Sequence, residues 1–272
     1  MRRDAGRTTQ DAQRLTRYQA DLHIHTLLSP CAEIEMIPSL IVAAAGLAGL
    51  DIIGIADHNS CDNAGAVIEA SAGSGIRVLP GLEVQSLEGV HLLCLFDTMD
   101  QARAMQETIY ASLPSPSPGG EGRGEGAYAP RYRKIFEQQL IVDGNDEFVS
   151  YCERLIGFPT SLEIEEIYGR VDELGGILIP SHIDRHETGI CGVLGMLPET
   201  PIFEAVEISP NLTSDQARSV YALGRKPILH SSDAHWLSAI GEHRTALHLE
   251  HRTVAEIRMA CRGEGGRMVE NA

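Results

Sequence analysis

The sequence has no closely spaced cysteine pair and no long hydrophobic run. Its six cysteines are scattered without a Cys-x-x-Cys motif, which favours free thiols in a reducing compartment over a disulfide framework or a structural zinc site. The most apolar stretch, residues 37–50, contains a proline and two glycines and predicts a buried helix, not a membrane span. The first residues lack the apolar segment of a secretory signal. We therefore expect a cytoplasmic protein with no membrane partner.

Basic and aromatic residues are also scarce. The chain has 22 Lys and Arg against 38 Asp and Glu, a formal net charge of -16, and only 5% aromatic residues. An acidic surface repels phosphate backbones, and few aromatic rings are available to stack on bases. The composition thus disfavours extended nucleic-acid binding. It leaves room for a small phosphorylated substrate, because metal ions and a few arginines can reverse the local potential.

Two motifs of ester and phosphate chemistry are missing as well. The chain contains no Gly-x-Ser-x-Gly and no Gly-x-x-x-x-Gly-Lys-Ser/Thr. These absences argue against a serine hydrolase and against a glycine-rich phosphate loop.

What is present is an alternation of strand and helix patterns. A length of 272 residues suits a single α/β barrel domain. Short β-branched or Leu-rich runs alternate with helical patterns, as in βα units around a largely parallel sheet. Capping-box spacing predicts helix starts at Thr98, Thr160, Thr213 and Thr253. The expected strands are 20–25, 51–56, 76–79, 81–84, 90–96, 177–180, 205–208, 227–230 and 245–249.

The domain organisation follows from two segments that break the alternation. Residues 1–18 are polar and predict a flexible N-terminal arm. Residues at about 114–130 are rich in Pro, Gly and Ser and cannot contribute to a core, so they predict a surface insertion. Strand patterns resume beyond the insertion, so residues 19–272 are expected to form one domain. A helix is expected near 133–139.

Two histidines stand two residues apart in the first expected strand, in Asp21-Leu-His-Ile-His25. Side chains alternate between strand faces, so His23 and His25 project to the same side. Neutral imidazole is a common ligand of Zn, Mn and Fe. The pair alone also fits exposed polar strand residues, so its meaning depends on the later strand ends.

Acids and imidazoles recur along the next strands. Asp57 and His58 follow the second expected strand, at the end where α/β barrels carry their active sites, although an Asp there can also form a turn. Glu83 lies inside an apolar run, where a carboxylate must be paired, exposed or metal-bound. His91 lies in the fifth strand, and by itself it fits a hydrogen-bonded core residue better than a ligand.

Further candidates accompany the last strands. His182 follows the sixth strand directly, and Arg185 beyond it could hold a phosphate or form a surface ion pair. Glu207, inside the seventh strand, could support a ligand from behind. Asp233 and His235 follow the eighth strand with the spacing of the first pair. Together these nitrogen and oxygen ligands favour Mn, Fe or Zn in a multinuclear site.

In this order the motifs resemble the polymerase and histidinol phosphatase (PHP) superfamily, from about Ala20 to Leu249. The resemblance implies a distorted (β/α)7 TIM-like barrel with two or three divalent metal ions at the strand C-termini. It rests on Asp21-Leu-His-Ile-His25, Ala56-Asp57-His58, Glu83, Ser181-His182 and Ser232-Asp233-Ala-His235.

The resemblance also implies ligand sets. One ion would be held by His23, His25, Glu83 and Asp233, a second by His58 and His235, and a third by Glu83, His91 and His182. We expect Asp233, His235 or Asp57 to handle protons. Arg185, with Arg244 as a further candidate, would bind phosphate.

One position departs from the family's pattern. Many members carry a His or Asp five or six residues after the second histidine of the first motif, where this chain has Pro30 and Cys31, with Glu33 just beyond. Cys31, Glu33 or a water could substitute, or the second metal position could be weak. Ser29-Pro30-Cys31 could also form a simple turn. Whether two or three ions bind depends on this loop.

The sequence therefore predicts a stand-alone phosphoesterase that hydrolyses a small phosphate monoester, nucleotide-like or an amino-alcohol phosphate, by a metal-activated hydroxide. One alternative is a phosphodiesterase or exonuclease acting on oligonucleotides, like the PHP modules of some DNA polymerases. Another is a non-catalytic metal-binding regulatory module. The scarcity of basic and aromatic residues counts against the former, and the nearly complete ligand set counts against the latter.

Overall fold

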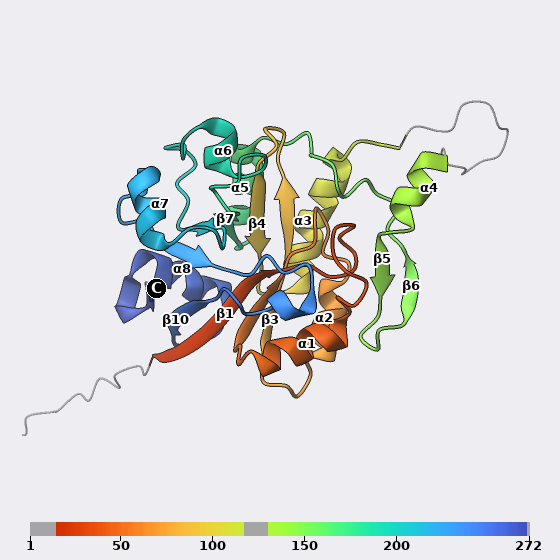
Figure 1. The fold of residues 1–272 in the computed structure, drawn as a ribbon, viewed down its shortest axis with the longest axis horizontal. Helices are drawn as coiled ribbons and strands as arrows, with labels where there is room; N and C mark the ends of the chain where they lie inside the picture. The colour runs from red at the N-terminus through yellow and green to blue at the C-terminus, as the bar shows by residue number, and fades with distance from the viewer. Residues whose placement is uncertain (1–14, 117–129, 271–272) are drawn as a thin grey trace, which may run out of the picture.

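The computed structural model describes residues 15–116 and 130–270. Most of the predicted arm (1–18) and most of the predicted insertion (114–130) lie outside the described residues. Residues 16–18 already belong to the first strand, so this strand begins before the predicted end of the arm. The described residues fold around one curled central sheet (Figure 1).

Seven strands form the central sheet, in the order β11-β10-β1-β2-β3-β4-β7, and β8–β9 and β5–β6 form two short sheets. Every expected strand is present, with the third and fourth merged into β3; β5, β6 and β11 were not expected. The strands are β1 (Thr16–Ile24), β2 (Ile52–Ile55), β3 (Arg77–Gln85), β4 (His91–Leu95), β5 (Leu140–Val142), β6 (Phe148–Tyr151), β7 (Ile177–Pro180), β8 (Val206–Ile208), β9 (Ile228–His230), β10 (Thr245–Leu249) and β11 (Met268–Val269).

The prediction of a largely parallel sheet is wrong, because only three of the seven strand pairs around the site are parallel. β1–β2, β2–β3 and β8–β9 are parallel, but β3–β4, β4–β7, β1–β10 and β10–β11 are antiparallel. The reason lies in the connections. Only residues 86–90 separate β3 from β4, which is too short for a crossover helix, so β4 must run back along β3.

The two ends of the curl approach each other through β8 and β9. At one side, the backbone N–H of Ile183, after β7, donates to the carbonyl of Glu207 in β8 at 2.9 Å. At the other side, Ala234, after β9, exchanges backbone hydrogen bonds with His23 and His25 of β1 at 3.2 and 3.0 Å. The result is a distorted TIM-like barrel.

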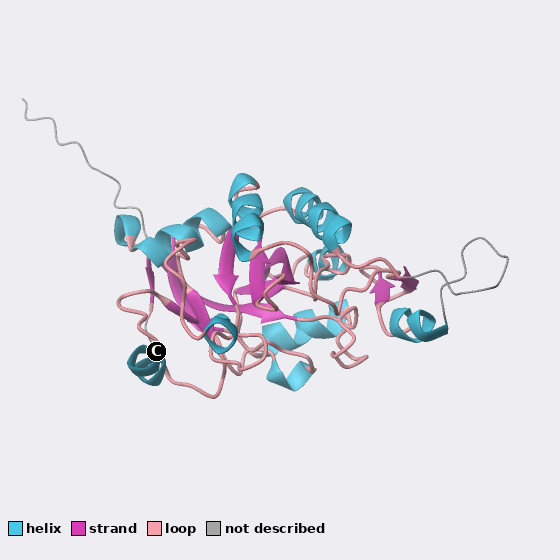
Figure 2. Cartoon of the chain, turned by 90° about the horizontal axis from the view of Figure 1, so that it is seen from above, coloured by secondary structure: helices cyan, strands magenta, loops and turns pink. Residues whose placement is uncertain are grey.

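Helices lie on both sides of the strands (Figure 2). They are α1 (Pro38–Leu47), α2 (Ala64–Ala70), α3 (Met99–Ser112), α4 (Pro130–Phe136), α5 (Ile164–Glu173), α6 (Ile190–Leu194), α7 (Ser214–Val220) and α8 (Val254–Arg262). Within the described ranges, no helix combines the length and apolar character that crossing a membrane requires.

Three of the four predicted helix starts are confirmed. Thr98 and Thr213 form complete capping boxes, and the Thr253 side chain accepts a hydrogen bond from the backbone of Glu256. The start at Thr160 is wrong. Its hydroxyl donates to the carbonyl of Gln85 at 2.9 Å and so fastens this segment to β3, while the capping residue of α5 is Glu163.

One face of the sheet carries two layers of side chains, one apolar and one polar. Leu79 and Glu83 lie on the same face of β3, as do Leu93 and His91 on β4, because side chains two residues apart share a face. Leu79 and Leu93 belong to a buried cluster that also includes residues of β7 and α8. The polar residues therefore stand above an apolar layer, at one end of the barrel.

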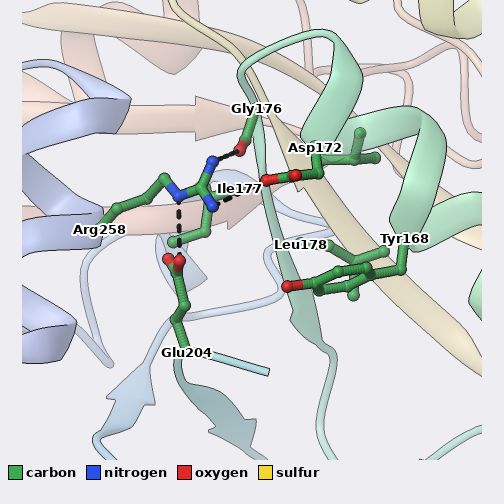
Figure 3. Close-up of a pocket in the computed structure, with 8 residues that line it drawn as sticks. Tyr168, Asp172, Gly176, Ile177, Leu178, Glu204 and Arg258 are labelled. Carbon is green, nitrogen blue, oxygen red and sulfur yellow. Dashed lines mark hydrogen bonds and ion pairs between the residues drawn. The ribbon is translucent and has the colours of Figure 1, made fainter. Parts of the chain in front are cut away.

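α8 is tied to the sheet by the guanidinium of Arg258 (Figure 3). Arg258 pairs with Glu204 at 3.0 Å and Asp172 at 2.8 Å, and donates to the carbonyl of Gly176 at 3.2 Å. The surrounding cavity measures only about 10 Å³. The arginine itself fills the gap, so this is a structural contact between α8, α5 and the start of β7.

We expect Gly54→Ala to destabilise the protein by about 1–3 kcal/mol through overpacking. Gly54 lies in β2, where an added Cβ would stand 2.2 Å from the carbonyl oxygen of Leu22 in β1. Thermal unfolding followed by circular dichroism measures the loss. The control is Gly169→Ala in α5, because an added Cβ there would meet no atom within 4 Å outside its own stretch of helix. Alanine also favours the helix more than glycine does. An equal loss of stability in both variants would contradict the explanation.

Candidate metal centre

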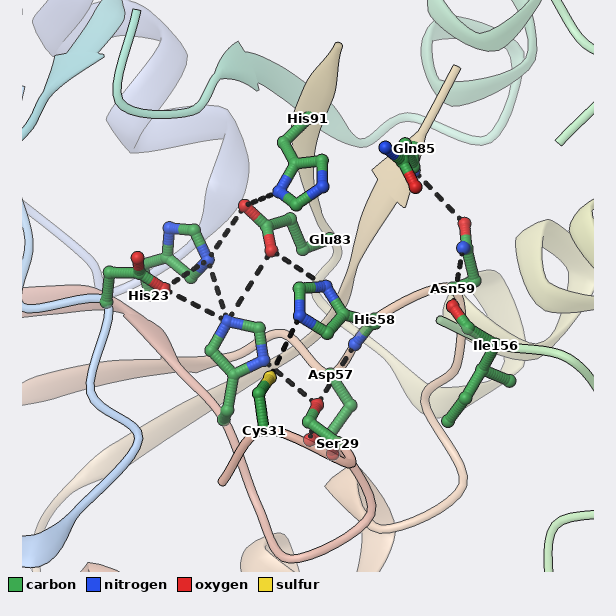
Figure 4. Close-up of polar contacts among 12 residues, drawn as sticks. His23, Ser29, Cys31, Asp57, His58, Asn59, Glu83, Gln85, His91 and Ile156 are labelled. Carbon is green, nitrogen blue, oxygen red and sulfur yellow. Dashed lines mark hydrogen bonds and ion pairs between the residues drawn. The ribbon is translucent and has the colours of Figure 1, made fainter. Parts of the chain in front are cut away.

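Histidines and acids from neighbouring strands meet at one end of the barrel (Figure 4). His23 lies in β1, Glu83 near the end of β3, and His91 at the start of β4. Because β4 runs back along β3, its first residue lies beside the last residues of β3. Residues from the loops after β2, β7 and β9 also belong to the cluster: His58, His182, Asp233 and His235.

Glu83 is the centre of this cluster. It is 1% exposed, and nitrogens of five histidines lie within 3.5 Å of its carboxylate. Burial raises the pKa of this carboxyl, but the neighbouring imidazoles outweigh burial and hold the pKa well below its usual range. The distances are 3.0 Å to His58, 3.1 Å to His91, 3.1 Å to His182, 3.3 Å to His23 and 3.5 Å to His25.

On the β1 side, His23, His25 and Asp233 point their donor atoms at one another. The Nε2 atoms of the two histidines are 3.2 Å apart, and Asp233 Oδ1 lies 3.4 Å from the first and 3.1 Å from the second. Burial lowers the pKa of His25 well below its usual value. A neutral imidazole and an ionised carboxylate that face the same point are ligands for a cation.

Glu207 holds His23 from behind. Its carboxylate oxygens lie 3.1 and 3.3 Å from His23 Nδ1, and one of them also accepts the backbone N–H of His182 at 3.2 Å. The Nδ1 proton is thereby fixed, so Nε2 is the nitrogen that faces the cluster. Such a carboxylate–histidine pair is the usual outer support of a metal-binding imidazole. The predicted supporting position of Glu207 agrees with this geometry.

A chain of hydrogen bonds through Ser29 to Asp57, which the sequence did not predict, holds His25. Its Nδ1 contacts the Ser29 hydroxyl at 3.0 Å, and this hydroxyl donates to Asp57 at 2.7 Å. The other donors to the Asp57 carboxylate are the backbone N–H and hydroxyl of Thr26, both at 2.7 Å. Burial raises the pKa of Asp57 despite these bonds. Asp57 is completely buried behind the cluster and does not line the cavity described below.

His235 and Arg185 complete the side of the cluster that faces solvent. The Nδ1 of His235 donates to the carbonyl of Asp233 at 2.8 Å, so Nε2 is the nitrogen left to contact Cys31. Arg185 places a guanidinium nitrogen 2.5 Å from Asp233 Oδ2. Burial raises the pKa of the Asp233 carboxyl, but the charge of His23 and the hydrogen bond from His25 outweigh burial and hold the pKa far below its usual range. The Asp233 oxygen that faces His23 and His25 is suited to bind a cation.

His58 stands between Glu83 and Cys31. Its Nδ1 faces the carboxylate and its Nε2 lies 3.2 Å from the Cys31 sulfur. Burial lowers the pKa of His58, but hydrogen bonds with Cys31 and Glu83 outweigh burial and raise the pKa to about 10. Burial raises the pKa of the Cys31 thiol, while hydrogen bonds from His235 and His58 lower the pKa to about 6. Cys31 and His58 thus form a hydrogen-bonded pair of sulfur and imidazole.

The donor atoms fit divalent metal ions. The Nδ1 of His91 and the Nε2 of His182 each lie 3.1 Å from Glu83 Oε1, so imidazole and carboxylate donors face one another where an ion would bind. Within the described residues, three groups bring their ligand atoms within 4.8 Å of one another. They are His25, His58 and His235; His23, His25, Glu83 and Asp233; and His58, Glu83 and His91.

The backbone is strained at the same place. Four residues other than glycine have positive φ in the described ranges, and three of them belong to the site or adjoin it: Asn59 at 51°, His182 at 28° and Asp233 at 48°. Non-glycine residues adopt this conformation at a cost of about 1–3 kcal/mol each, and such strain concentrates at functional sites. The fold therefore holds these side chains in set positions.

A cavity of about 530 Å³ opens over the cluster, lined among others by Cys31, His58, His91, Arg185, Asp233 and His235. A second cavity of about 220 Å³ shares His58 and His91 with the first and extends towards Asn59, Gln85 and Ile156. Open space thus lies on two sides of the cluster.

Three candidates lie away from this cavity. Glu33 is exposed, and only its backbone reaches the site, donating to the carbonyl of His235 at 2.8 Å. Arg244 donates to the carbonyl of Ala48 at 2.6 Å, so it does not accompany Arg185. Asp57 lies behind the cluster, as described above. Of the two residues proposed to replace the family's usual ligand after the first motif, Cys31 and Glu33, only Cys31 faces the metal centre.

The sequence was compared with known families and proteins. No family model matches the sequence. Over 117 residues, the chain is 27% identical to the uncharacterized protein YqxK of Bacillus subtilis (strain 168), and this match covers 41% of the chain and 30% of YqxK. The chain thus spans less than a third of the curated relative that it matches.

Solved structures cover more of the chain. The lesion-specific endonuclease PfuEndoQ from Pyrococcus furiosus is similar with a TM-score of 0.62 and 21% identity, over 93% of this chain and 58% of that one. A complex of endonuclease Q with a 27-mer duplex substrate, with an abasic lesion at the active site, gives a TM-score of 0.67 at 20% identity over the same shares.

A two-domain protein from Bacteroides vulgatus is also similar. It is described as containing a predicted PHP-like metal-dependent phosphoesterase, and it matches with a TM-score of 0.52 and 15% identity, over 100% of this chain and 69% of that one. These identities are low, but the share of this chain that each structure covers agrees with the resemblance seen in the sequence. The chain has the fold of the PHP-like metal-dependent phosphoesterases.

Proposed function

We propose that the chain is a metal-dependent phosphoesterase, a hydrolase acting on phosphate esters. The observation that carries this proposal is the ring of five imidazoles around the buried carboxylate of Glu83. Divalent ions bound there would supply Lewis acidity to phosphoryl oxygens and would lower the pKa of bound water. The donor set suits Mn, Fe or Zn.

The proposed ligands follow the three sides of Glu83. His23 and His25, fixed by Glu207 and Ser29, face one position with Asp233. The remaining imidazoles surround the other two positions. They are His58 and His235 at the second, and His91 and His182, with Glu83, at the third.

Arg185 is the proposed phosphate-binding residue, because its guanidinium lines the cavity and reaches Asp233. We expect Arg185→Ala to raise the KM for a phosphate ester about tenfold, the loss of one charge-assisted contact. Steady-state kinetics and inhibition by inorganic phosphate measure this effect. Arg244→Ala is the control, since that guanidinium binds a backbone carbonyl elsewhere. An unchanged KM in Arg185→Ala would assign Arg185 to its ion pair alone.

We expect metal affinity to rise with pH and metal binding to release protons. The pKa of His58 is raised to about 10, so its imidazole carries a proton at neutral pH and must lose it to become a ligand. The apparent affinity for Zn²⁺ should therefore increase up to about tenfold per pH unit between about pH 6 and pH 9. Calorimetry in buffers of different ionisation enthalpy counts the protons. Affinity that is independent of pH would contradict a protonated His58.

The first substrate candidate is a small phosphate monoester, nucleotide-like or an amino-alcohol phosphate. The formal net charge of -16 supports it, because an acidic surface repels long polyanions. Arg185 is also the only Arg or Lys among the residues lining the larger cavity. A monoester carries one organic group, which that cavity could hold.

The second candidate is a phosphodiester within a nucleic acid. It is favoured by the two cavities that share His58 and His91, because a phosphodiester needs room for an organic group on each side of phosphorus. The endonuclease Q complex also corrects the expectation drawn from composition. A protein of this fold binds a 27-mer duplex, so the fold itself is compatible with a nucleic-acid substrate.

A substrate panel separates these candidates. Metal-replete protein is assayed for phosphate release from mononucleotides and amino-alcohol phosphates, and for strand cleavage of a short duplex with and without an abasic site. Release of phosphate supports the monoester, and cleavage of the duplex supports the phosphodiester. The proposed function would be wrong if neither substrate reacted. If the inactive protein nevertheless bound metal, and His23→Ala lost that metal, the chain would be a metal-binding regulatory module.

A further inference from the structure

The loop between β1 and α1 brings a sulfur atom to the metal centre. Cys31 Sγ lies 3.2 Å from His58 Nε2 and also hydrogen-bonds the His235 side chain. All three residues line the larger cavity. The Cys31 sulfur thus lies on the side of His58 opposite Glu83 (Figure 4).

The position of this sulfur is fixed by the loop on both sides of it. Before Cys31, the Ser29 hydroxyl donates to Asp57 at 2.7 Å, and the backbone N–H of Ala32 donates back to the Ser29 carbonyl at 2.9 Å. After Cys31, the backbone N–H of Glu33 donates to the carbonyl of His235 at 2.8 Å. The loop is therefore attached to Asp57, which follows β2, and to His235, whose imidazole would share the ion.

The imidazoles are prepared for a ligand on this side. His235 donates its Nδ1 proton to the carbonyl of Asp233, so Nε2 is the ring nitrogen left to face Cys31 and an ion beside it. His58 presents one nitrogen to Glu83 and the other to Cys31. The other five cysteines are buried, so Cys31 is the one thiol that stands in the cavity.

We propose that Cys31 is a thiolate ligand of the second metal position, together with His58 and His235. The proposal rests on the proposed function only in requiring that the site binds metal. Cysteine sulfur binds Zn²⁺, Fe²⁺ and Co²⁺ far better than Mg²⁺ or Mn²⁺. A sulfur donor at this position selects the softer ions there, while the oxygen-rich position around Asp233 accepts harder ones. It also makes a full cluster of three ions possible in this chain.

Cobalt substitution tests the ligand directly. Co²⁺ bound by a thiolate shows a near-ultraviolet sulfur-to-cobalt charge-transfer band that nitrogen and oxygen ligands do not give. We expect the wild-type protein to show this band, and Cys31→Ser to lose both the band and one equivalent of cobalt. Cys31→His should lose the band but keep the equivalent. Cys191→Ser, a change at a buried cysteine outside the cavity, should keep both.

A second measurement uses the unaltered protein. With Zn²⁺ bound, alkylation of Cys31 by iodoacetamide, located by peptide mass mapping, should slow at least about tenfold relative to metal-free protein. A fully loaded protein without the band, or equal alkylation with and without Zn²⁺, would overturn the proposal. A protein that shows the band but hydrolyses no phosphate ester would leave the ligand in place and refute the proposed function.

Discussion

Glu83→Gln is expected to remove most of the bound metal and to lower phosphoester hydrolysis by more than about 10²-fold. Loss of a supporting partner around a metal already costs about 10–100-fold in affinity or activity, and Glu83 contacts five of the proposed ligands itself. The amide has the same size as the acid but no charge and only one oxygen. It therefore cannot bridge two ions, and it leaves the surrounding imidazoles without their anion.

The measurement combines elemental analysis of protein purified without chelator with turnover of the best substrate from the panel. Glu256→Gln is the matched control, because it neutralises another buried carboxylate. Glu256 accepts a hydrogen bond from Arg267 at 2.7 Å and does not line the cavity. This control should unfold at a lower temperature but keep its metal. Equal metal content and turnover in Glu83→Gln and wild-type protein would rule out a bridging carboxylate.

The strand-borne part of this site could be predicted because strands obey a simple period. The two-residue spacing of His23 and His25 fixes a common face, and both residues indeed point into the cluster. Glu83 was recognisable for an energetic reason, since a carboxylate inside an apolar run needs a partner. Barrel strands then bring their ends together, which is why residues far apart in the chain could be assigned to one centre.

Residues on the loops could not be placed in this way, because a loop has no period. Asp57 and His58 are adjacent, yet one points behind the cluster to Thr26 and the other into it. The same holds for Cys31 and Glu33, of which only the first reaches the cavity. These outcomes depend on hydrogen bonds between loops, such as that from Ser29 to Asp57, which no local pattern encodes.

Sheet direction was missed for a different reason. Strand patterns show where strands lie, but parallel and antiparallel pairing both satisfy the same hydrophobic runs. The short connection between β3 and β4 was the available signal, since so few residues cannot form a crossover. This reversal matters for the site, because it places His91 at the beginning of its strand and still beside the end of β3.

Asp57→Asn is expected to lower stability by about 2–4 kcal/mol, because a buried carboxylate with charge-assisted hydrogen bonds loses its charge and one acceptor oxygen. In the folded protein the carboxylate accepts bonds from Thr26 and Ser29, and an amide would present a donor to at least one of these donors. For a chain of this size the melting temperature should fall by roughly 5–15 °C. Differential scanning calorimetry measures the change.

The same variant decides what Asp57 does for the reaction. If Asp57 positions Ser29 and thereby His25, metal affinity should fall about 10–100-fold, while the pH profile at saturating metal stays as in wild-type protein. If Asp57 carried the proton, saturating metal would not restore turnover and the profile would shift. Asp172→Asn is the control, because it breaks an exposed ion pair with Arg258. It should change the free energy of unfolding and the free energy of metal binding by less than about 1 kcal/mol each. The complete burial of Asp57 and its three hydrogen bonds favour the positioning role.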